Sequence, residues 1–132
     1  MKIQRSIALG LTLALIALAA LACGKTGNST PTEAWQTYYN AVKNTDVKAM
    51  KSISPKKYRE QVEDAAKVEN ITVDEGLTRE LKRIAPRFPA TMPETRNEKI
   101  EGDKATLEIK NGENWSKVHL VKEDDGWKAD FR

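Results

Sequence analysis

The chain contains one cysteine and one histidine, too few for several common kinds of site. A single cysteine excludes an intrachain disulfide. One histidine, with no carboxylates at ligand spacing, gives no basis for predicting a metal site, and no cofactor motif is present. The formal net charge is only +3, and no aromatic platform accompanies the basic residues. We therefore do not expect nucleic acid as a partner.

The composition of the 132 residues changes near residue 23. Residues 1–22 are dominated by apolar side chains, whereas only about a third of the following residues are apolar, a modest supply for a core. Loss of Lys2 and Arg5 with this segment would lower the net charge from +3 to +1. The length and this division predict one small, nearly neutral domain over residues 31–132.

Residues 1–22 have the organisation of an export signal. Lys2 and Arg5 form a short basic region, and Ile7–Ala22 is almost wholly apolar. A membrane-spanning helix needs about 20 apolar residues, so this run is short for a span and suits the central region of a signal peptide.

The apolar run ends in Ala20-Leu21-Ala22-Cys23-Gly24, which resembles the lipobox of bacterial lipoproteins with the first two residues exchanged. The resemblance implies cleavage before Cys23 and attachment of lipid to its thiol, which would anchor the protein stably to a membrane. Gly24, where Asp commonly signals inner-membrane retention, implies the outer membrane, facing the periplasm, in a Gram-negative cell. The alternatives are an ordinary secretory signal with an incidental cysteine and an uncleaved membrane anchor.

The segment after the cysteine is expected to be a tether. Gly24–Thr30 is small and polar, and seven such residues span about 15 Å as a random coil. The predicted organisation is therefore a lipoprotein signal peptide over residues 1–22, a lipidated cysteine with a flexible tether over residues 23–30, and the domain.

Capping signals and helical periodicity predict four helices. Thr30–Glu33 combines a capping threonine, a proline at the first helical position and a glutamate that completes a capping box. Asn44–Asp46 ends that helix and begins a short second one. Ser54-Pro55 repeats the cap-plus-proline signal before a helix running to about Glu69, and Thr72–Glu75 is a second capping box.

From Glu94 onward, apolar and polar residues alternate with the period of strands. Four strands are predicted, with turns at Gly102-Asp103, Asn111-Gly112 and Asp124-Asp125-Gly126: Glu94–Glu101 at an edge, one containing Leu107, Trp115–Lys122 and Trp127–Phe131. Helices followed by an antiparallel meander indicate an α+β fold, in which the N-terminal helices pack on a curved four-stranded sheet. The mouth of such a cone is a natural pocket.

Four segments resemble small lipoproteins, of uncharacterised function, in the nuclear transport factor 2-like superfamily, whose fold is the ketosteroid-isomerase-like, cystatin-like cone. The segments are Thr30-Pro31-Thr32-Glu33-Ala34, Tyr38–Asp46, Met92–Ile100 and Val121–Lys128, and the likeness covers roughly residues 31–132. These motifs are helix caps and hairpin turns. The superfamily includes isomerases, dehydratases, ligand-binding domains and transport factors, and fold alone does not choose among them.

Aromatic residues are the candidate lining of a pocket for an apolar ligand: Trp35, Tyr38, Trp127 and Phe131. The alternative is that these side chains form the core of a domain short of apolar residues. No catalytic motif matches, and no catalytic residue is assigned. Asp46 is expected in the first turn of the second helix, and Tyr38 and Tyr39 in aromatic packing.

Three further features have a functional and a structural interpretation. His119 alternates with Val118 and Leu120, so it faces solvent if they face the core, and a base or pH-sensing role is its other interpretation. Trp115, beside a turn, is the aromatic expected to be exposed, as at an interaction edge. Four basic residues on or near one helix end either suit the helix dipole or contact anionic headgroups: Arg79, Lys82, Arg83 and Arg87.

The sequence thus predicts a membrane-anchored cell-envelope lipoprotein with a non-catalytic domain. The domain would bind a small apolar ligand or a protein or peptide partner. The alternatives are an envelope enzyme of the isomerase or dehydratase type that uses the cone pocket, and a scaffold that acts through its sheet surface.

Overall fold

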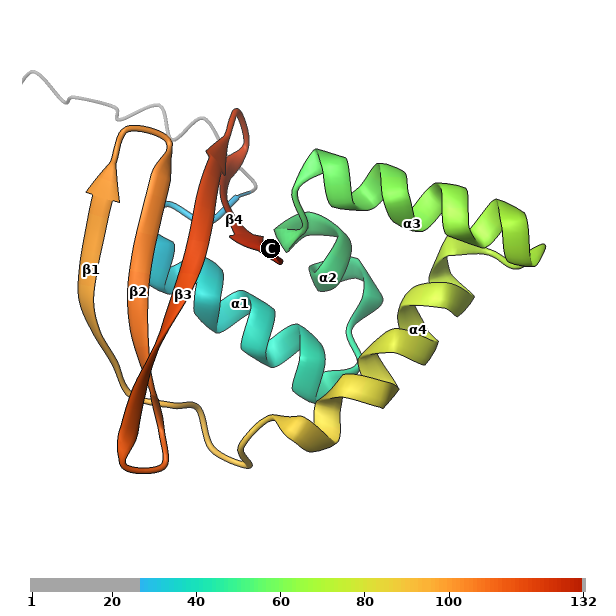
Figure 1. Ribbon diagram of the computed structural model, residues 1–132. Helices are drawn as coiled ribbons and strands as arrows, with labels where there is room; N and C mark the ends of the chain where they lie inside the picture. Colours follow the sequence, from blue (N-terminus) through green and yellow to red (C-terminus); the bar gives the residue numbers. More distant parts are fainter. Residues whose placement is uncertain (1–26, 132) are drawn as a thin grey trace, which may run out of the picture.

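The computed structural model describes residues 27–131, so the predicted signal peptide, Cys23 and the start of the tether lie outside the described residues. Helices precede strands, as the sequence predicted (Figure 1): α1 (Pro31–Asn44), α2 (Val47–Ile53), α3 (Lys56–Glu69), α4 (Val73–Ile84), the short 3₁₀ helix η1 (Ala85–Arg87), β1 (Thr95–Glu101), β2 (Lys104–Asn111), β3 (Asn114–Glu123) and β4 (Gly126–Asp130). The strands form one antiparallel sheet in the order β1-β2-β3-β4, which confirms the α+β class.

Both predicted capping boxes are present, but the third predicted cap is wrong. The hydroxyls of Thr30 and Thr72 accept hydrogen bonds from the main chain at the third position of α1 and α4. The Ser54 hydroxyl instead donates to the carbonyl of Met50 at 2.6 Å and closes the end of α2. Pro55 then takes the position before α3 and has no side-chain cap to offer.

The meander differs from the prediction at two of its turns. Gly102-Asp103 is a turn as expected, with φ +65° at the glycine. The second turn is Gly112-Glu113, because Asn111 still pairs with the first residue of β3. The third turn is Asp124-Asp125, and Gly126 is already the first residue of β4.

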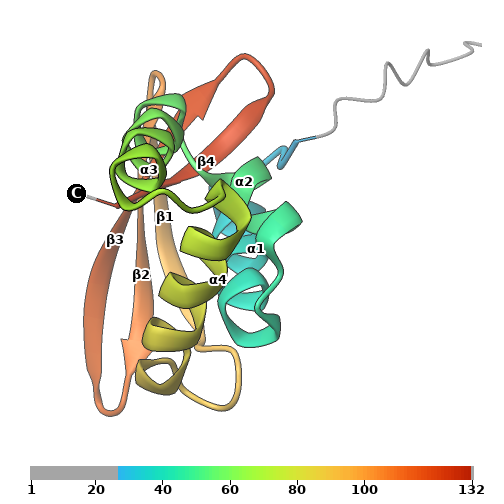
Figure 2. The same ribbon diagram turned by 90° about the vertical axis from the view of Figure 1, so that its right-hand side faces the viewer.

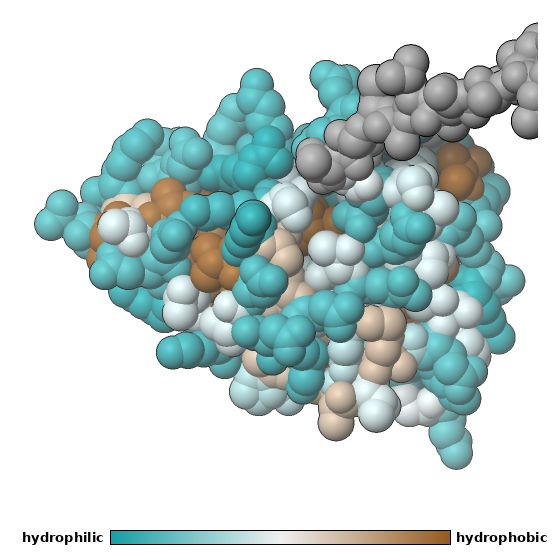
Figure 3. All heavy atoms as spheres, turned by 180° about the vertical axis from the view of Figure 1, so that it is seen from behind, coloured by the Kyte–Doolittle hydropathy of each residue, from teal (hydrophilic) through white to brown (hydrophobic). Residues whose placement is uncertain are grey.

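The core lies between α1 and the sheet, and α2 and α4 close its side (Figure 1). The most deeply buried apolar side chains come from these elements: Ala34, Val42, Met50, Ile53, Leu81, Leu107 and Leu120. α3 and α4 form a helical hairpin that stands apart from the sheet in Figure 1, and in the turned view it lies in front of the strands (Figure 2). Hydrophobic residues surface on that side of a mostly hydrophilic face (Figure 3), and the Val68 side chain of α3 is 88% exposed.

Part of the predicted tether is attached to the domain. The main chain of Asn28 forms an isolated bridge with Trp127 of β4, whose N–H donates to the Asn28 carbonyl at 3.0 Å. The side chain of Asn28 also accepts a 2.6 Å hydrogen bond from the Thr37 hydroxyl of α1. Gly27 lies so close to the Asp125 carbonyl that a Cβ atom would have no room. Gly27–Thr30 is therefore not a free tether, because Asn28 is bonded to both β4 and α1.

A cleft between the sheet and the helical hairpin

A cleft of about 490 Å³ separates the middle of β3 and the end of β4 from the helices. It is lined from α1, α2, α3, α4 and both strands, and its lining residues include Trp35, Tyr38, Tyr58, Glu80, Ile84 and Phe131. Small-molecule sites commonly enclose about 300–1,000 Å³ and are mostly apolar with a few polar groups. The cleft therefore has the size of a small-molecule site, and its lining combines aromatic residues with charged ones such as Glu80, Lys117 and Asp130.

Aromatic rings of α1, of α3 and of Phe131, which follows β4, form one continuous wall of the cleft. The Tyr58 ring of α3 lies 4.5 Å from the Phe131 ring, and Phe131 lies 5.2 Å from Tyr38 of α1. Tyr38 in turn packs at 5.7 Å against both Trp35, one helical turn earlier, and Phe88 beyond η1. Such tilted and edge-on pairs add to the stability gained by burial. The wall is therefore held in place without any ligand.

The structure brings together three of the four predicted lining residues. Trp35, Tyr38 and Phe131 line the cleft. Trp127 is buried in the core near the Asn28 bridge and does not line it. Tyr58 and Ile84 of the helical hairpin line it as well, and sequence reasoning did not select them because their helical periodicity is equally typical of core residues.

The two tyrosines of the cleft are hydrogen-bond donors at neutral pH. Burial, and then the proximity of Tyr58 and Glu80, raises the pKa of Tyr38 to about 12. Burial and Glu80 also raise the pKa of Tyr58. Both phenols therefore keep their protons, and they offer O–H groups beside an apolar wall.

The carboxyl group of Glu80 is a poor candidate for a catalytic base. Arg83 donates to it from Nε at 2.8 Å, and this hydrogen bond lowers the pKa of Glu80. A carboxyl group that works as a general base or acid near neutral pH commonly has a raised pKa. Glu80 is instead an ionised, paired carboxylate at the rim.

The other candidate residues are placed as follows. Asp46 caps α2, where its carboxylate accepts from the N–H of Ala49 at 2.9 Å. Tyr39 donates to the carbonyl of Pro89 at 2.7 Å. His119 is exposed, as the strand alternation predicted, and its position in β3 is beside the cleft.

Trp115 is half-buried rather than exposed, contrary to expectation, because the guanidinium of Arg96 lies 3.8 Å above its ring. The basic residues of α4 do not form a uniformly positive surface either. Arg79 pairs with Glu69 at 2.7 Å, and Arg83 pairs with Glu80. Both pairs reduce the attraction that α4 would exert on anionic headgroups.

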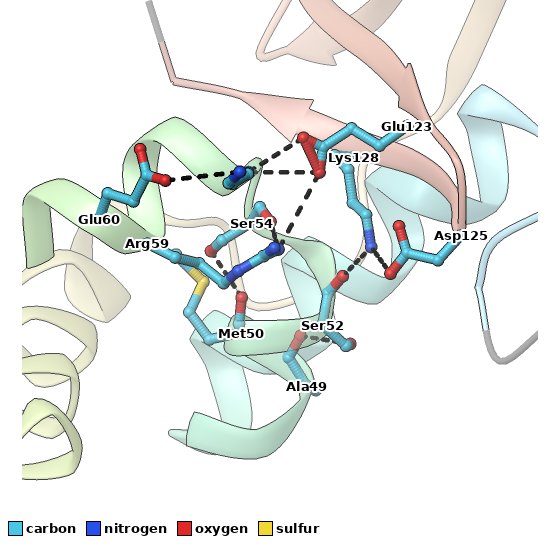
Figure 4. A network of polar contacts seen from close by, with 10 residues as sticks. Ala49, Met50, Ser52, Ser54, Arg59, Glu60, Glu123, Asp125 and Lys128 are labelled. Atoms are coloured by element: carbon cyan, nitrogen blue, oxygen red, sulfur yellow. Dashed lines mark hydrogen bonds and ion pairs between the residues drawn. The ribbon is translucent and has the colours of Figure 1, made fainter. Parts of the chain in front are cut away.

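A polar network that the sequence did not reveal attaches α3 to the sheet (Figure 4). The Glu123 carboxylate of β3 accepts the N–H of Lys56 at 3.0 Å, so it supplies the N-terminal cap that Pro55 does not offer. Arg59 of α3 donates to the carbonyl of Ser54 at 2.6 Å. The network therefore holds α3 where Tyr58 meets the cleft.

Lys128 forms the other half of this network and is only 1% exposed. Its ammonium donates to the carbonyl of Ser52 at 2.6 Å and to Asp125 at 2.8 Å, which joins the end of α2 to β4 (Figure 4). A buried ammonium is stable only when it is paired and hydrogen-bonded. Lys128 therefore fixes β4, the strand that directly precedes Phe131.

Within residues 27–131, no group of histidine, cysteine and carboxylate side chains is arranged to hold a metal ion. No helix among these residues is long and apolar enough to cross a bilayer. Comparisons of the chain with protein-family models, curated proteins and solved structures found no match. Its function must therefore be inferred from the cleft.

Proposed function

We propose that the protein is a cell-envelope lipoprotein whose domain binds a small apolar ligand or a peptide partner in this cleft and does not catalyse a reaction. The aromatic wall made by Trp35, Tyr38, Tyr58 and Phe131 is the observation that carries the proposal. Two protonated phenols can orient a ligand that has an acceptor atom. The lowered pKa of Glu80 gives the isomerase or dehydratase alternative no support.

We further propose that the fold is the cone of the nuclear transport factor 2-like superfamily. Its support is the order of the elements, with α1 across a four-stranded antiparallel meander and a cleft beside the sheet. Because this cone serves enzymes and binding proteins alike, it supports the existence of a site without naming its ligand.

The proposed anchor is lipid on Cys23, with the domain at the periplasmic face of the outer membrane if the cell is Gram-negative. Gly27 is fixed beside the β3–β4 turn, and residues 24–26 are all that separate it from the cysteine. The chain from Cys23 to Gly27 reaches at most about 14 Å. The end of the sheet at this turn would therefore lie close to the bilayer.

Substitution of Cys23 tests the anchor. Cys23→Ser removes the thiol that would accept the lipid, so it should release the protein from membranes or leave its leader uncut. Ser29→Ala, in the short segment that is attached to the domain, is the control and should remain processed and membrane-bound. Membrane fractionation and the mass of the processed protein are the two measurements. If the Cys23→Ser protein remains both processed and membrane-bound, the lipid anchor is excluded.

Native mass spectrometry tests ligand binding directly. Protein extracted from the membranes of its own host should carry a reproducible extra mass that is lost on denaturation. Tyr58→Ala should reduce the occupied fraction, because it removes one ring and one phenol from the cleft, whereas the exposed Val68→Ala should not. An extra mass that is retained equally in Tyr58→Ala would place the ligand elsewhere.

A further inference from the structure

The two strands at the cleft differ in length, and this leaves part of β3 uncovered. β4 pairs with β3 only between His119 and Glu123, whereas β3 continues along β2 back to Asn114. Among residues 27–131, the stretch from Asn114 to Val118 therefore has no partner strand on its β4 side. Figure 1 shows β3 extending well beyond the end of β4.

The register shows which main-chain groups point to this uncovered side. In an antiparallel pair, alternate residues direct their N–H and C=O groups to the same neighbour. The two-residue turn makes Glu123 and Gly126 the closing pair, so every second residue from Glu123 down to His119 bonds to β4. The same alternation directs the N–H and C=O of Lys117 and Trp115 away from β2, toward the edge of β3 that β4 does not cover.

The cleft runs along this free edge. Four consecutive residues of β3, Lys117–Leu120, and three consecutive residues at the end of the sheet, Ala129–Phe131, line it. Side chains of consecutive strand residues point to opposite faces, so they can all border one cavity only where it meets the edge of the strand. On the opposite side, Tyr58 and Ile84 of the helical hairpin supply an apolar wall.

We infer that the cleft binds an extended peptide segment, which adds to β3 as a strand beyond the end of β4. Only another strand carries main-chain donors and acceptors at the spacing that Lys117 and Trp115 present. The pairing of β4 with the adjacent half of the same edge shows that this edge accepts a strand. The inference rests on the proposed function only in using the same cleft, and it does not depend on the lipid anchor.

The chemistry of the cleft also selects the peptide's side chains. Residues of an added strand that lie on the Val118 and Leu120 face of the sheet meet the aromatic wall of Tyr38 and Tyr58, so they should be apolar. The intervening residues face the exposed side of the sheet, beside Lys117 and His119, so they should be polar. The expected partner is an extended segment of alternating apolar and polar residues.

A displayed library of short peptides with this alternation, selected on the protein purified from its own host, provides the probe. A selected peptide should slow hydrogen exchange of the Lys117 and Trp115 amides several-fold at saturation and leave the amide of Leu107, in the middle of β2, unchanged. Methylation of peptide nitrogens should abolish binding at alternate positions and be tolerated between them, because only alternate N–H groups face β3.

Two variants of one residue complete the test. Lys117→Pro removes an N–H that points away from β2, so it should abolish binding and keep the β2–β3 pairing, whereas Lys117→Ala should retain binding. If the proline variant does not fold, the methylation pattern decides. Failure to select any binder would overturn the inference. Binding that is equally affected by methylation at every peptide nitrogen would overturn it as well. If the cleft binds a small apolar molecule and no peptide, the inference is overturned but the proposed function is supported.

Discussion

The half of the domain formed by α1, α2 and the sheet buries many large apolar side chains, whereas α3 buries only Ala66. α1 contributes Trp35 and Val42 to the core, and β2 and β3 contribute Leu107 and Leu120. α3 and α4, which form the other half, are both amphipathic. α4 buries Leu77 and Leu81 against its neighbours, whereas α3 packs mainly on α4.

This difference shows how α3 is held. Its attachment to the sheet consists of the Glu123 cap, the weaker approach of Arg59 to the same carboxylate at 4.0 Å, and the contact of Tyr58 with Phe131. Segments with few buried apolar contacts open locally at lower free energy than the core. Since the cleft lies between the two halves, local opening of α3 would change the cleft while the sheet stays folded.

Truncation in the sheet should have the largest effect. Leu107 is 1% exposed at the centre of β2, and Leu→Ala substitutions at such sites cost about 2–5 kcal/mol. We expect Leu107→Ala to lower the free energy of unfolding of the whole domain by this amount in urea denaturation. Val68→Ala in α3 should change it by less than about 0.5 kcal/mol, because the side chain is already in water. Equal losses would contradict the division into two differently stabilised halves.

Replacement of Lys128 should have the next largest effect. Lys128→Met keeps the buried volume but leaves the carbonyl of Ser52 without its donor, which costs about 1–3 kcal/mol. Urea denaturation measures the loss, and the exposed Lys104→Met is the matched control. A Lys128→Met protein as stable as the wild type would mean that the ammonium contributes no net stability, as some buried ion pairs do not.

The elements of this fold could be predicted from local signals. The caps at Thr30 and Thr72 and the alternation through Leu107 depend on residues within one turn or one strand. The solvent-facing position of His119 followed from the same alternation. The aromatic residues of the cleft were partly predictable, because Trp35 and Tyr38 share a helical face.

The contacts between distant residues could not be predicted in the same way. Alternation along β4 indicates that Lys128 faces solvent, but the end of α2 covers that face and provides an acceptor. Ser54 before a proline has the pattern of a cap, yet Glu123, 67 residues away from Lys56, caps α3. Likewise, nothing in the polar stretch around Asn28 shows that its main chain bonds to β4.

A smaller, local effect is expected for the cap of α3. Glu123→Gln keeps an acceptor but removes the charge that favours a helix N-terminus, an interaction of about 0.3–1 kcal/mol. Hydrogen exchange should become faster in the first turn of α3 and remain unchanged in α1. Glu113→Gln, in the exposed β2–β3 turn, is the control. Faster exchange in α1 as well would show that α3 and the sheet open together.

The smallest expected effect is on how the free energy of unfolding changes at acid pH. The hydrogen bond from Lys128 lowers the pKa of Asp125, so the folded state holds this proton less tightly than the unfolded chain, in which an aspartate has a pKa of about 3.9. The stabilisation is therefore complete above that value and is lost as the pH falls through the lower pKa of the folded state. The effect should be small because the Asp125 side chain is more than half exposed and screened by solvent.

Asp125→Asn tests this effect against the larger ones. The variant should be slightly less stable than the wild type near neutral pH, and the difference should shrink as the pH is lowered below about 4. Asp124→Asn, the neighbouring exposed turn residue, should show no such convergence. If the difference between Asp125→Asn and the wild type stays constant with pH, the charge of Asp125 is not what stabilises the turn. The contribution of Lys128 would then come from the Ser52 carbonyl alone, and β4 would be held to α2 without an ion pair.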